Sequence, residues 1–440
     1  ARAMFKKHPY GTQPTLGTIE HLKNPSLKRI GEYYRAHYVP NNMCVAVAGD
    51  FERKPMLGFL ERRLGGWKPA PFPEIKRWPL PPPGGAERAE IRYEAEEKVA
   101  VGWMAVPNKH PELDAVTMMS MVMDNGTAGI INVELNQKQK VKSAQAFAQS
   151  LNDAGGFYVI ASPKTGQTLE QAEALLLECV DKLKAGDFPE ELLAGAIANF
   201  EKSRKRQLEY NEARVNQMAM SFVNREEWEY SAAWLERLRK VKKEDVVRAA
   251  RRYLGPDRVV VYRRQGKPDL PKITKPAFTK IAMDAERQSD FFRRIASLPA
   301  VPIEPRWVKE GADYTVSDRP FGRLYAGPNP MNDVFHLGIG FTDVGTRDEK
   351  ELEAVMRLLD LSGAGEMTPR RFKERLFALG TSLYWGTNER WVFVGMDGLE
   401  KNLEESLRLV MDLFSRPNVE PGTLEKMADV ALGAHQDNKK

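Results

Sequence analysis

The feature that most constrains this 440-residue chain is an internal repeat. Residues 34–50 (YRAHYVPNNMCVAVAGD) and residues 249–265 (AARRYLGPDRVVVYRRQ) align without a gap, which places Tyr38 on Tyr253. Both segments predict a helix that ends in tyrosine, a short turn and an apolar strand. A repeat of this kind indicates a fold that is built from several copies of one structural unit.

Two further matches preserve the order of the elements. Residues 157–183 match residues 392–414, and both predict a strand, a loop and an amphipathic helix. Residues 101–121 match residues 336–360, and both predict a strand that is followed by a helix. Because order and spacing agree in all three matches, we interpret them as a true repeat.

One complete unit runs from about residue 87 to residue 265. The first 66 residues match only the end of this unit, and residues 331–440 match only its beginning. A half unit leaves a sheet edge and apolar helix faces uncovered. We therefore expect the chain to be a window from a longer protein of about four such units, in which the remaining segments of the parent chain cover these faces. The alternative is that the two half units pack together.

Breaks in composition divide the chain further. The segment KPAPFPEIKRWPLPPPGG contains seven prolines, which excludes a helix or a central strand and indicates an extended linker. The predicted division is a half unit over 1–67, a Pro-rich linker over 68–85, a complete unit over 86–265, a linker region over 266–330 and a half unit over 331–440. The predicted fold class is α+β, with repeated units of largely antiparallel sheet and helices packed on it.

Composition excludes several classes of protein. The formal net charge of +6 comes from 66 basic and 60 acidic residues, which indicates a mixed-charge surface, and no nucleic-acid-binding motif is present. No apolar stretch approaches the roughly 18 to 20 residues that span a bilayer. Cys44 and Cys179 lie in apolar runs and are predicted to be buried, and a disulfide between them is left open.

Four short motifs near the start of the chain carry a resemblance to a known family. They are His8-Pro9-Tyr10-Gly11, Leu16-Gly17-Thr18, His37-Tyr38 and Pro40-Asn41-Asn42-Met43, and a strand ending in Gly-Asp-Phe follows. This order resembles the segment after the zinc site in pitrilysin/insulinase-type metallopeptidases. The match is specific across residues 1–51 and weaker, but consistent in order, through residue 440. It implies four similar α+β domains that form two bowl-shaped halves around a chamber.

The resemblance also implies a catalytic zinc that is held by an inverted H-x-x-E-H motif and a downstream glutamate, all in the first domain. The sequence contains neither H-x-x-E-H nor H-E-x-x-H. The corresponding helices of the later units, residues 113–124 and residues 352–363, carry no histidine, and Ala434 stands about where the glutamate would be needed. Catalytic zinc needs three protein ligands. We therefore predict no catalytic, cofactor-binding or metal-binding residue in this chain, and the family's substrate-facing arginine and tyrosine would lie beyond Lys440.

The histidines are interpreted as structural. His8 belongs to a loop motif that is structural in the family too, and His37 lies on an amphipathic helix. His21 and His37 are too far apart in sequence to bind one metal from a single helical turn. The remaining three are isolated in the sequence: His110, His336 and His435.

Two functions follow from the resemblance. The first is part of a zinc-dependent metallopeptidase that hydrolyses peptides in an enclosed chamber, where zinc belongs to the parent protein and this chain alone is inactive. The alternative is a catalytically inactive homologue that acts as a scaffold or peptide-binding subunit. Expected partners are peptides and the remaining segments of the parent chain or a catalytic partner subunit, without nucleic acid or a transmembrane segment, and dimerisation is left open. The sequence leaves the compartment open, and a periplasmic or otherwise extracytoplasmic bacterial location is a working hypothesis.

Overall fold

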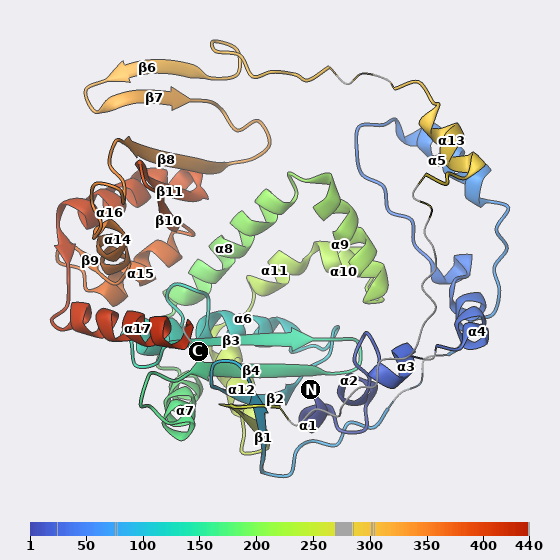
Figure 1. The fold of residues 1–440 in the computed structure, drawn as a ribbon, viewed down its shortest axis with the longest axis horizontal. Helices are drawn as coiled ribbons and strands as arrows, with labels where there is room; N and C mark the ends of the chain where they lie inside the picture. The colour runs from blue at the N-terminus through green and yellow to red at the C-terminus, as the bar shows by residue number, and fades with distance from the viewer. Residues whose placement is uncertain are drawn as a thin grey trace. The chain divides into compact units, whose positions relative to one another are not determined.

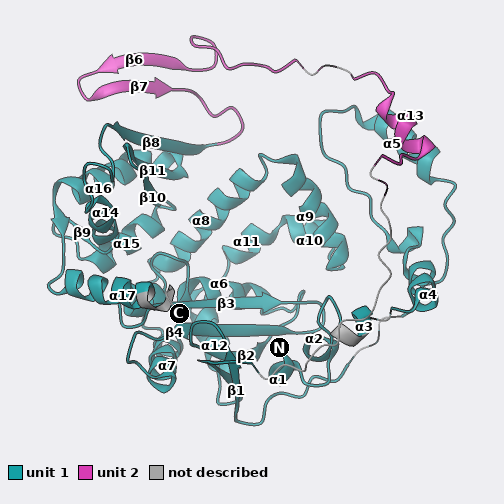
Figure 2. Ribbon diagram, in the orientation of Figure 1, with its two compact units in different colours: residues 1–269, 333–440 teal, residues 270–332 magenta. Residues whose placement is uncertain are grey.

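The computed structural model describes the chain except for residues 24, 75, 77, 269–283, 285, 301, 303 and 439–440 (Figure 1). The chain divides into two units, which are described separately (Figure 2). The first unit comprises residues 1–269 and 333–440, and the second comprises residues 270–332. In the described residues, no helix combines the length and the apolar character that crossing a membrane requires.

A five-stranded sheet forms the centre of the first unit. Its strands lie in the order β1-β5-β2-β4-β3, and only β1 and β5 pair in parallel. Their bounds are β1 (Ala86–Tyr93), β2 (Lys98–Ala105), β3 (Ser143–Ser150), β4 (Gly155–Ser162) and β5 (Arg258–Gln265). Val101 in the central strand lies opposite both Val159 and Val260. The sequence predicts that four segments, residues 99–106, 143–150, 156–162 and 258–264, form strands of one sheet, and the structure confirms that prediction.

Helices cover one face of this sheet. Three of them contact its strands: α6 (Leu113–Met123), α7 (Leu169–Ala185) and α12 (Lys243–Tyr253). The other helices of this region are α8 (Glu191–Gln207), α9 (Asn211–Val223) and two short helices that the sequence analysis did not predict, α10 (Trp228–Ala232) and α11 (Trp234–Leu238). Thr168 and Gln171 form a capping box at the start of α7, and Gly186 ends that helix in the left-handed conformation. Met118 and Met119 of α6 are fully buried, so these methionines serve the core.

The start of the chain packs against the same sheet. The short helices α1 (Arg2–Phe5) and α2 (Pro9–Thr12) bring Met4 and Phe5 into an apolar cluster with Ala154 and Val259. Lys6 also forms an ion pair with Glu87 at 2.7 Å. This ion pair links the segment between α1 and α2 to β1.

A smaller sheet organises residues 333–440 of the first unit. Its order is β10-β11-β8, all antiparallel, with β8 (Val334–Thr342), β10 (Ser382–Thr387) and β11 (Trp391–Leu399). The other elements are α14 (Leu352–Asp360), β9 (Gly363–Ala364), α15 (Pro369–Ala378), η3 (Glu400–Asn402), α16 (Leu403–Ser415), β12 (Pro417–Asn418) and α17 (Thr423–Asn438). The strand and helix order of β8–α14 and β11–α16 reproduces that of β2–α6 and β4–α7, as the repeat predicts. The sequence analysis did not predict β10.

Residues 13–67 contain one clear departure from the sequence prediction. The segment folds as α3 (Ile19–Lys23), α4 (Leu27–His37), η1 (Pro40–Asn42) and α5 (Arg53–Leu64). The strand predicted over residues 43–48 does not form, and Val45 is 56% exposed. The structure therefore contradicts the strand part of the match between residues 34–50 and residues 249–265, because a strand needs a neighbour to accept its backbone hydrogen bonds. Matched segments of a repeat should contain the same elements in the same order. This pairing fails that test and does not support the repeat, whereas the other two pairings pass it.

The second unit contains more regular structure than the predicted linker region implies. It includes α13 (Asp290–Ala296) and a hairpin of β6 (Thr315–Arg319) and β7 (Gly322–Ala326). Strand β7 is exposed along its whole length, which explains why its sequence shows no alternation of buried residues. The linker predicted at residues 266–276 falls largely outside the described residues.

Candidate functional site

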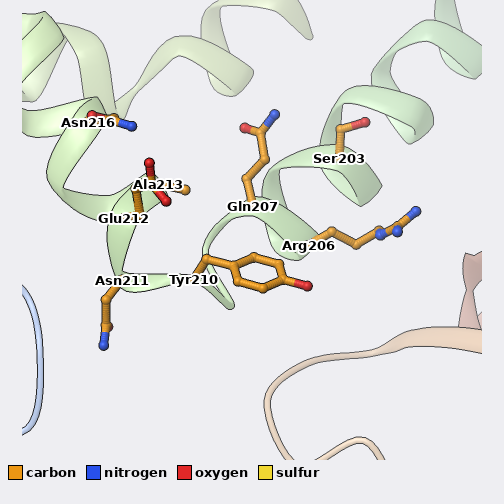
Figure 3. A pocket seen from close by; sticks show the side chains of 8 residues that line it. All are labelled: Ser203, Arg206, Gln207, Tyr210, Asn211, Glu212, Ala213 and Asn216. Atoms are coloured by element: carbon orange, nitrogen blue, oxygen red, sulfur yellow. The ribbon is translucent and has the colours of Figure 1, made fainter.

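The turn between α8 and α9 forms an open pocket of about 590 Å³ (Figure 3). The pocket takes side chains from the last turns of α8, from the connection and from the first turns of α9: Ser203, Arg206, Gln207, Tyr210, Asn211, Glu212, Ala213 and Asn216. Tyr210 is 67% exposed, so its ring and hydroxyl are available to a ligand. The lining combines amide donors and acceptors, a guanidinium and an aromatic ring, which is chemistry suited to peptide binding.

A buried ion pair fixes the same helix against the smaller sheet. Lys202 of α8 and Asp397 of β11 are each 4% exposed, and Lys202 Nζ lies 3.2 Å from Asp397 Oδ2. Lys202 Nζ also donates a hydrogen bond of 2.6 Å to Ser382 Oγ. Arg206, which lines the pocket, reaches the other oxygen of Asp397 at 3.3 Å. The pocket is thus anchored on one side by a charge network in which Lys202 and Asp397 are buried and Arg206 is half exposed.

Burial lowers the pKa of Lys202, and the nearby Asp397 carboxylate opposes that effect. Because Asp397 faces the ammonium group, Lys202 is held as an ion-pair partner rather than released as a neutral base for Ser382. The arrangement therefore has the character of a structural anchor and a binding surface. It does not present a nucleophile, a base and a third group that orients the base.

The helices that would carry the metal motif do not fit a zinc ion. α6 fills the corresponding position in the complete unit with fully buried Met118, Met119 and Val122, which are not zinc ligands. α14 carries no histidine, and the side chain of Ala434 lies outside the described residues. Across the described part of the chain, no group of three or more His, Cys, Asp or Glu side chains could hold a metal ion. The prediction that this chain has no metal-binding residue stays a prediction.

The histidines occupy separate places in the fold. His8 is buried and its Nδ1 accepts a hydrogen bond of 3.1 Å from the Tyr10 amide, which caps α2. Its Nε2 lies 3.6 Å from Asp153. The ring of His37 packs on Tyr33 at 4.3 Å between centroids. The other four histidines take no part in these contacts. His110 Nδ1 accepts a hydrogen bond from the Glu112 amide, and His21, His336 and His435 are exposed.

The two cysteines differ. Cys179 is buried in α7, and burial raises its pKa to about 12, so it is a core residue as predicted. Cys44 is exposed, which contradicts the prediction that both are buried. The cause is the missing strand over residues 43–48, because no neighbouring element covers that run. Both thiols are free.

Comparison with known proteins gives a consistent class. The family model described as the Peptidase M16 inactive domain matches residues 26–200. The zinc protease PqqE of Helicobacter pylori is 26% identical over 189 residues, which is 41% of each chain. An uncharacterized zinc protease of Streptomyces coelicolor is 23% identical over 264 residues, 58% of this chain and 57% of the relative. The chain spans about half the length of the curated relatives it matches.

Solved structures share the fold. A protease from Helicobacter pylori has a TM-score of 0.55 at 21% identity and covers 59% of this chain and 64% of its own. The ferredoxin protease FusC, solved in complex with Arabidopsis ferredoxin, has a TM-score of 0.51 at 16% identity over 99% of this chain and 52% of its own. The periplasmic protease PqqL of Escherichia coli has a TM-score of 0.50 at 12% identity over 99% of this chain and 51% of its own.

The sheets with helices packed on them, together with these matches, define a pitrilysin-like peptidase fold, which confirms the predicted α+β class. These matches support a relation to the pitrilysin-type (M16) peptidases, as the motifs at residues 8–43 indicated. Its homologues are zinc proteases, and the part matched by the family model is of the inactive-domain type.

Proposed function

We propose that this chain forms a non-catalytic part of a zinc-dependent peptidase and supplies walls of the chamber in which peptides are hydrolysed. The observation that carries the proposal is the match of residues 26–200 to the inactive domain of the family. The absence of both zinc-binding motifs from the sequence supports it. In this proposal the zinc ion and its ligands belong to another part of the whole protein.

The pocket between α8 and α9 is the proposed peptide-contacting surface of this wall. Arg206, Gln207 and Asn211 can exchange hydrogen bonds with a peptide backbone, and Tyr210 offers an aromatic surface. The buried Lys202–Asp397 pair holds α8 in place, so the surface keeps its shape when a peptide binds. A wall of this kind contributes to selectivity through positioning rather than through bond breaking.

The location and partners of the whole protein are part of the proposal. The fold is shared with a protease that is described as periplasmic, which supports an extracytoplasmic site. It is also shared with a protease that was solved with a ferredoxin, which supports peptide or small-protein substrates. Peptides and the catalytic part of the same protein are therefore the proposed partners.

A cleavage assay tests the proposal. The purified 440-residue chain is incubated with a quenched fluorescent peptide library, with and without a zinc chelator. We expect no chelator-sensitive cleavage by this chain and chelator-sensitive cleavage by the whole protein. Cleavage by the 440-residue chain that the chelator abolishes would contradict the proposal. Failure of the whole protein to cleave would instead favour the inactive scaffold.

A further inference from the structure

A second pocket lies where four segments of the first unit meet, away from the α8–α9 turn. It encloses about 810 Å³ and is lined by the loop before α6, the β3–β4 turn, the end of α9, and parts of the first 74 residues. The residues that the argument uses are Tyr10, Glu74, Lys109, His110, Asp153 and Arg225. The volume lies in the range of roughly 300–1,000 Å³ that is typical of small-ligand sites.

Hydrogen bonds between the four segments build the walls. The Asn108 amide donates to the carbonyl of Leu151 at 2.8 Å, which joins the loop before α6 to the β3–β4 turn. Asn152 Nδ2 donates to the carbonyl of Val223 at 3.3 Å, which adds the end of α9. The Asp153 amide donates to the hydroxyl of Tyr10 at 3.3 Å, which adds α2. The pocket is therefore cross-linked and formed before any ligand binds.

The pocket carries charges of both signs. Lys109 and Arg225 have no ion pair and no side-chain hydrogen bond among the residues that the structure describes, and the same holds for Glu74. Asp153 contacts His8 Nε2 at 3.6 Å and remains partly exposed. With two cations and two carboxylates, the four charged side chains of the pocket have no net charge, but they offer ionic contacts of both signs to a ligand.

Backbone conformation shows that the two cations stand at unusual positions. Lys109 has φ of 64° and Arg225 has φ of 57°, a left-handed region in which glycine is unstrained and longer side chains are disfavoured. Both cationic side chains therefore stand where the backbone conformation costs energy, which is consistent with use of the side chains themselves.

We propose that this pocket binds a short peptide with both termini free. The carboxylate terminus pairs with Lys109 and Arg225, and the ammonium terminus pairs with Glu74 and Asp153. Neutral lining groups such as the Tyr10 hydroxyl and the His110 ring contact the peptide between its ends. This inference goes beyond the chamber-wall role and is independent of it, because a wall need not retain any ligand.

Isothermal titration calorimetry of the 440-residue chain with the tripeptide Ala-Ala-Ala tests the proposal. We expect saturable binding, and we expect N-acetylation or C-terminal amidation to weaken it by roughly three- to tenfold each, because each removes one ion pair. Arg225→Gln or Lys109→Gln is expected to abolish the preference for a free carboxylate, and Glu74→Gln the preference for a free ammonium. Lys240→Gln, an exposed cation between α11 and α12, is the matched control and is expected to change neither preference.

Three results would overturn the proposal. They are absence of saturable binding by Ala-Ala-Ala up to about 10 mM, equal binding of the doubly blocked peptide, and preferences that survive all three pocket variants. These results can be distinguished from the outcome of the cleavage assay, because calorimetry measures binding and does not depend on peptidase activity. Circular dichroism of each variant shows that it remains folded.

Discussion

Residues 34–50 and residues 249–265 carry nearly the same pattern of helix, turn and apolar run, yet they fold differently. In the second segment α12 ends at Tyr253 and β5 follows, between β1 and β2. In the first segment α4 ends at His37, and the apolar run forms no strand. Val260 is 1% exposed, and its counterpart Val45 is 56% exposed. The comparison shows that an apolar run becomes a strand only where neighbouring strands and helices cover it.

The largest expected difference in stability comes from introducing a carboxylate at Val260 and at its counterpart Val45. Val260→Asp buries a carboxylate in the central sheet and is expected to lower the free energy of unfolding by about 4 kcal/mol or more. Val45→Asp is expected to change it by no more than about 0.5 kcal/mol. Urea denaturation that is followed by circular dichroism measures both. A comparable loss for Val45→Asp would show that residues 43–48 are covered, against the comparison.

The second effect concerns the hydrogen bonds between Glu173 and the strands β1 and β5. Residues 34–50 have no corresponding interaction. Glu173 of α7 is buried and accepts two hydrogen bonds of 2.8 Å from Arg88 of β1 and one of 2.5 Å from the hydroxyl of Tyr262 of β5. Glu173→Gln weakens three hydrogen bonds to a buried carboxylate but leaves Arg88 half exposed to water, and we expect a loss of about 1–3 kcal/mol at pH 7. Glu404→Gln in the exposed pair with Arg408 is the control, with an expected loss below about 0.5 kcal/mol.

The pH dependence of this effect follows from the pKa of Glu173. Burial raises that pKa, but Arg88 and Tyr262 outweigh burial and hold it below the ordinary value of 4.5. The contribution of a carboxylate with a depressed pKa is fully present above its unfolded value and is lost as the pH falls through its folded value. The gap in stability between the natural chain and Glu173→Gln should therefore be constant above about pH 5 and shrink below pH 4.5. A stability gap that stays constant below pH 4.5 would contradict the proposed role of the Glu173 carboxylate in holding Arg88 and Tyr262.

The smallest effect concerns two helix ends. Gly186 ends α7 with φ of 74°, and a Cβ there would meet Val247 Cγ2 at 3.3 Å. Gly186→Ala is expected to cost about 1 kcal/mol. Gly66, just after α5, has open space around its Cα, and Gly66→Ala is expected to be neutral within about 0.5 kcal/mol. Thermal unfolding compares the two, and equal costs would argue against a special role for the left-handed end of α7.

The sequence predicted the long, strongly patterned elements well. Residues 113–123 form a helix where one was predicted, and the four strands that were predicted to share one sheet lie in the larger sheet. Short or exposed elements were missed, such as β10, α10 and the β6–β7 hairpin, because they bury few residues and so leave no periodic signal. The strand over residues 43–48 was predicted wrongly because its pattern says nothing about its neighbours.

Neither pocket could be found from the sequence. The α8–α9 pocket depends on an ion pair between Lys202 and Asp397, which are far apart in the chain and carry no local motif. The second pocket brings together Tyr10 of α2 with Lys109 and Arg225, which lie in two separate loops. A charge in a loop is ordinarily a solvated surface group, so only the fold reveals that these charges share one pocket.

The central claim is that this chain, which is similar to pitrilysin-type peptidases, supplies a non-catalytic part of a zinc peptidase. The most direct test is the zinc content of the purified chain, measured by plasma mass spectrometry after equilibration with excess zinc and removal of free metal. We predict no stoichiometric zinc, because the helices at the motif positions carry no histidine and the sequence contains neither H-x-x-E-H nor H-E-x-x-H. One tightly bound zinc ion per chain, removed by a chelator together with any cleavage activity, would contradict the account.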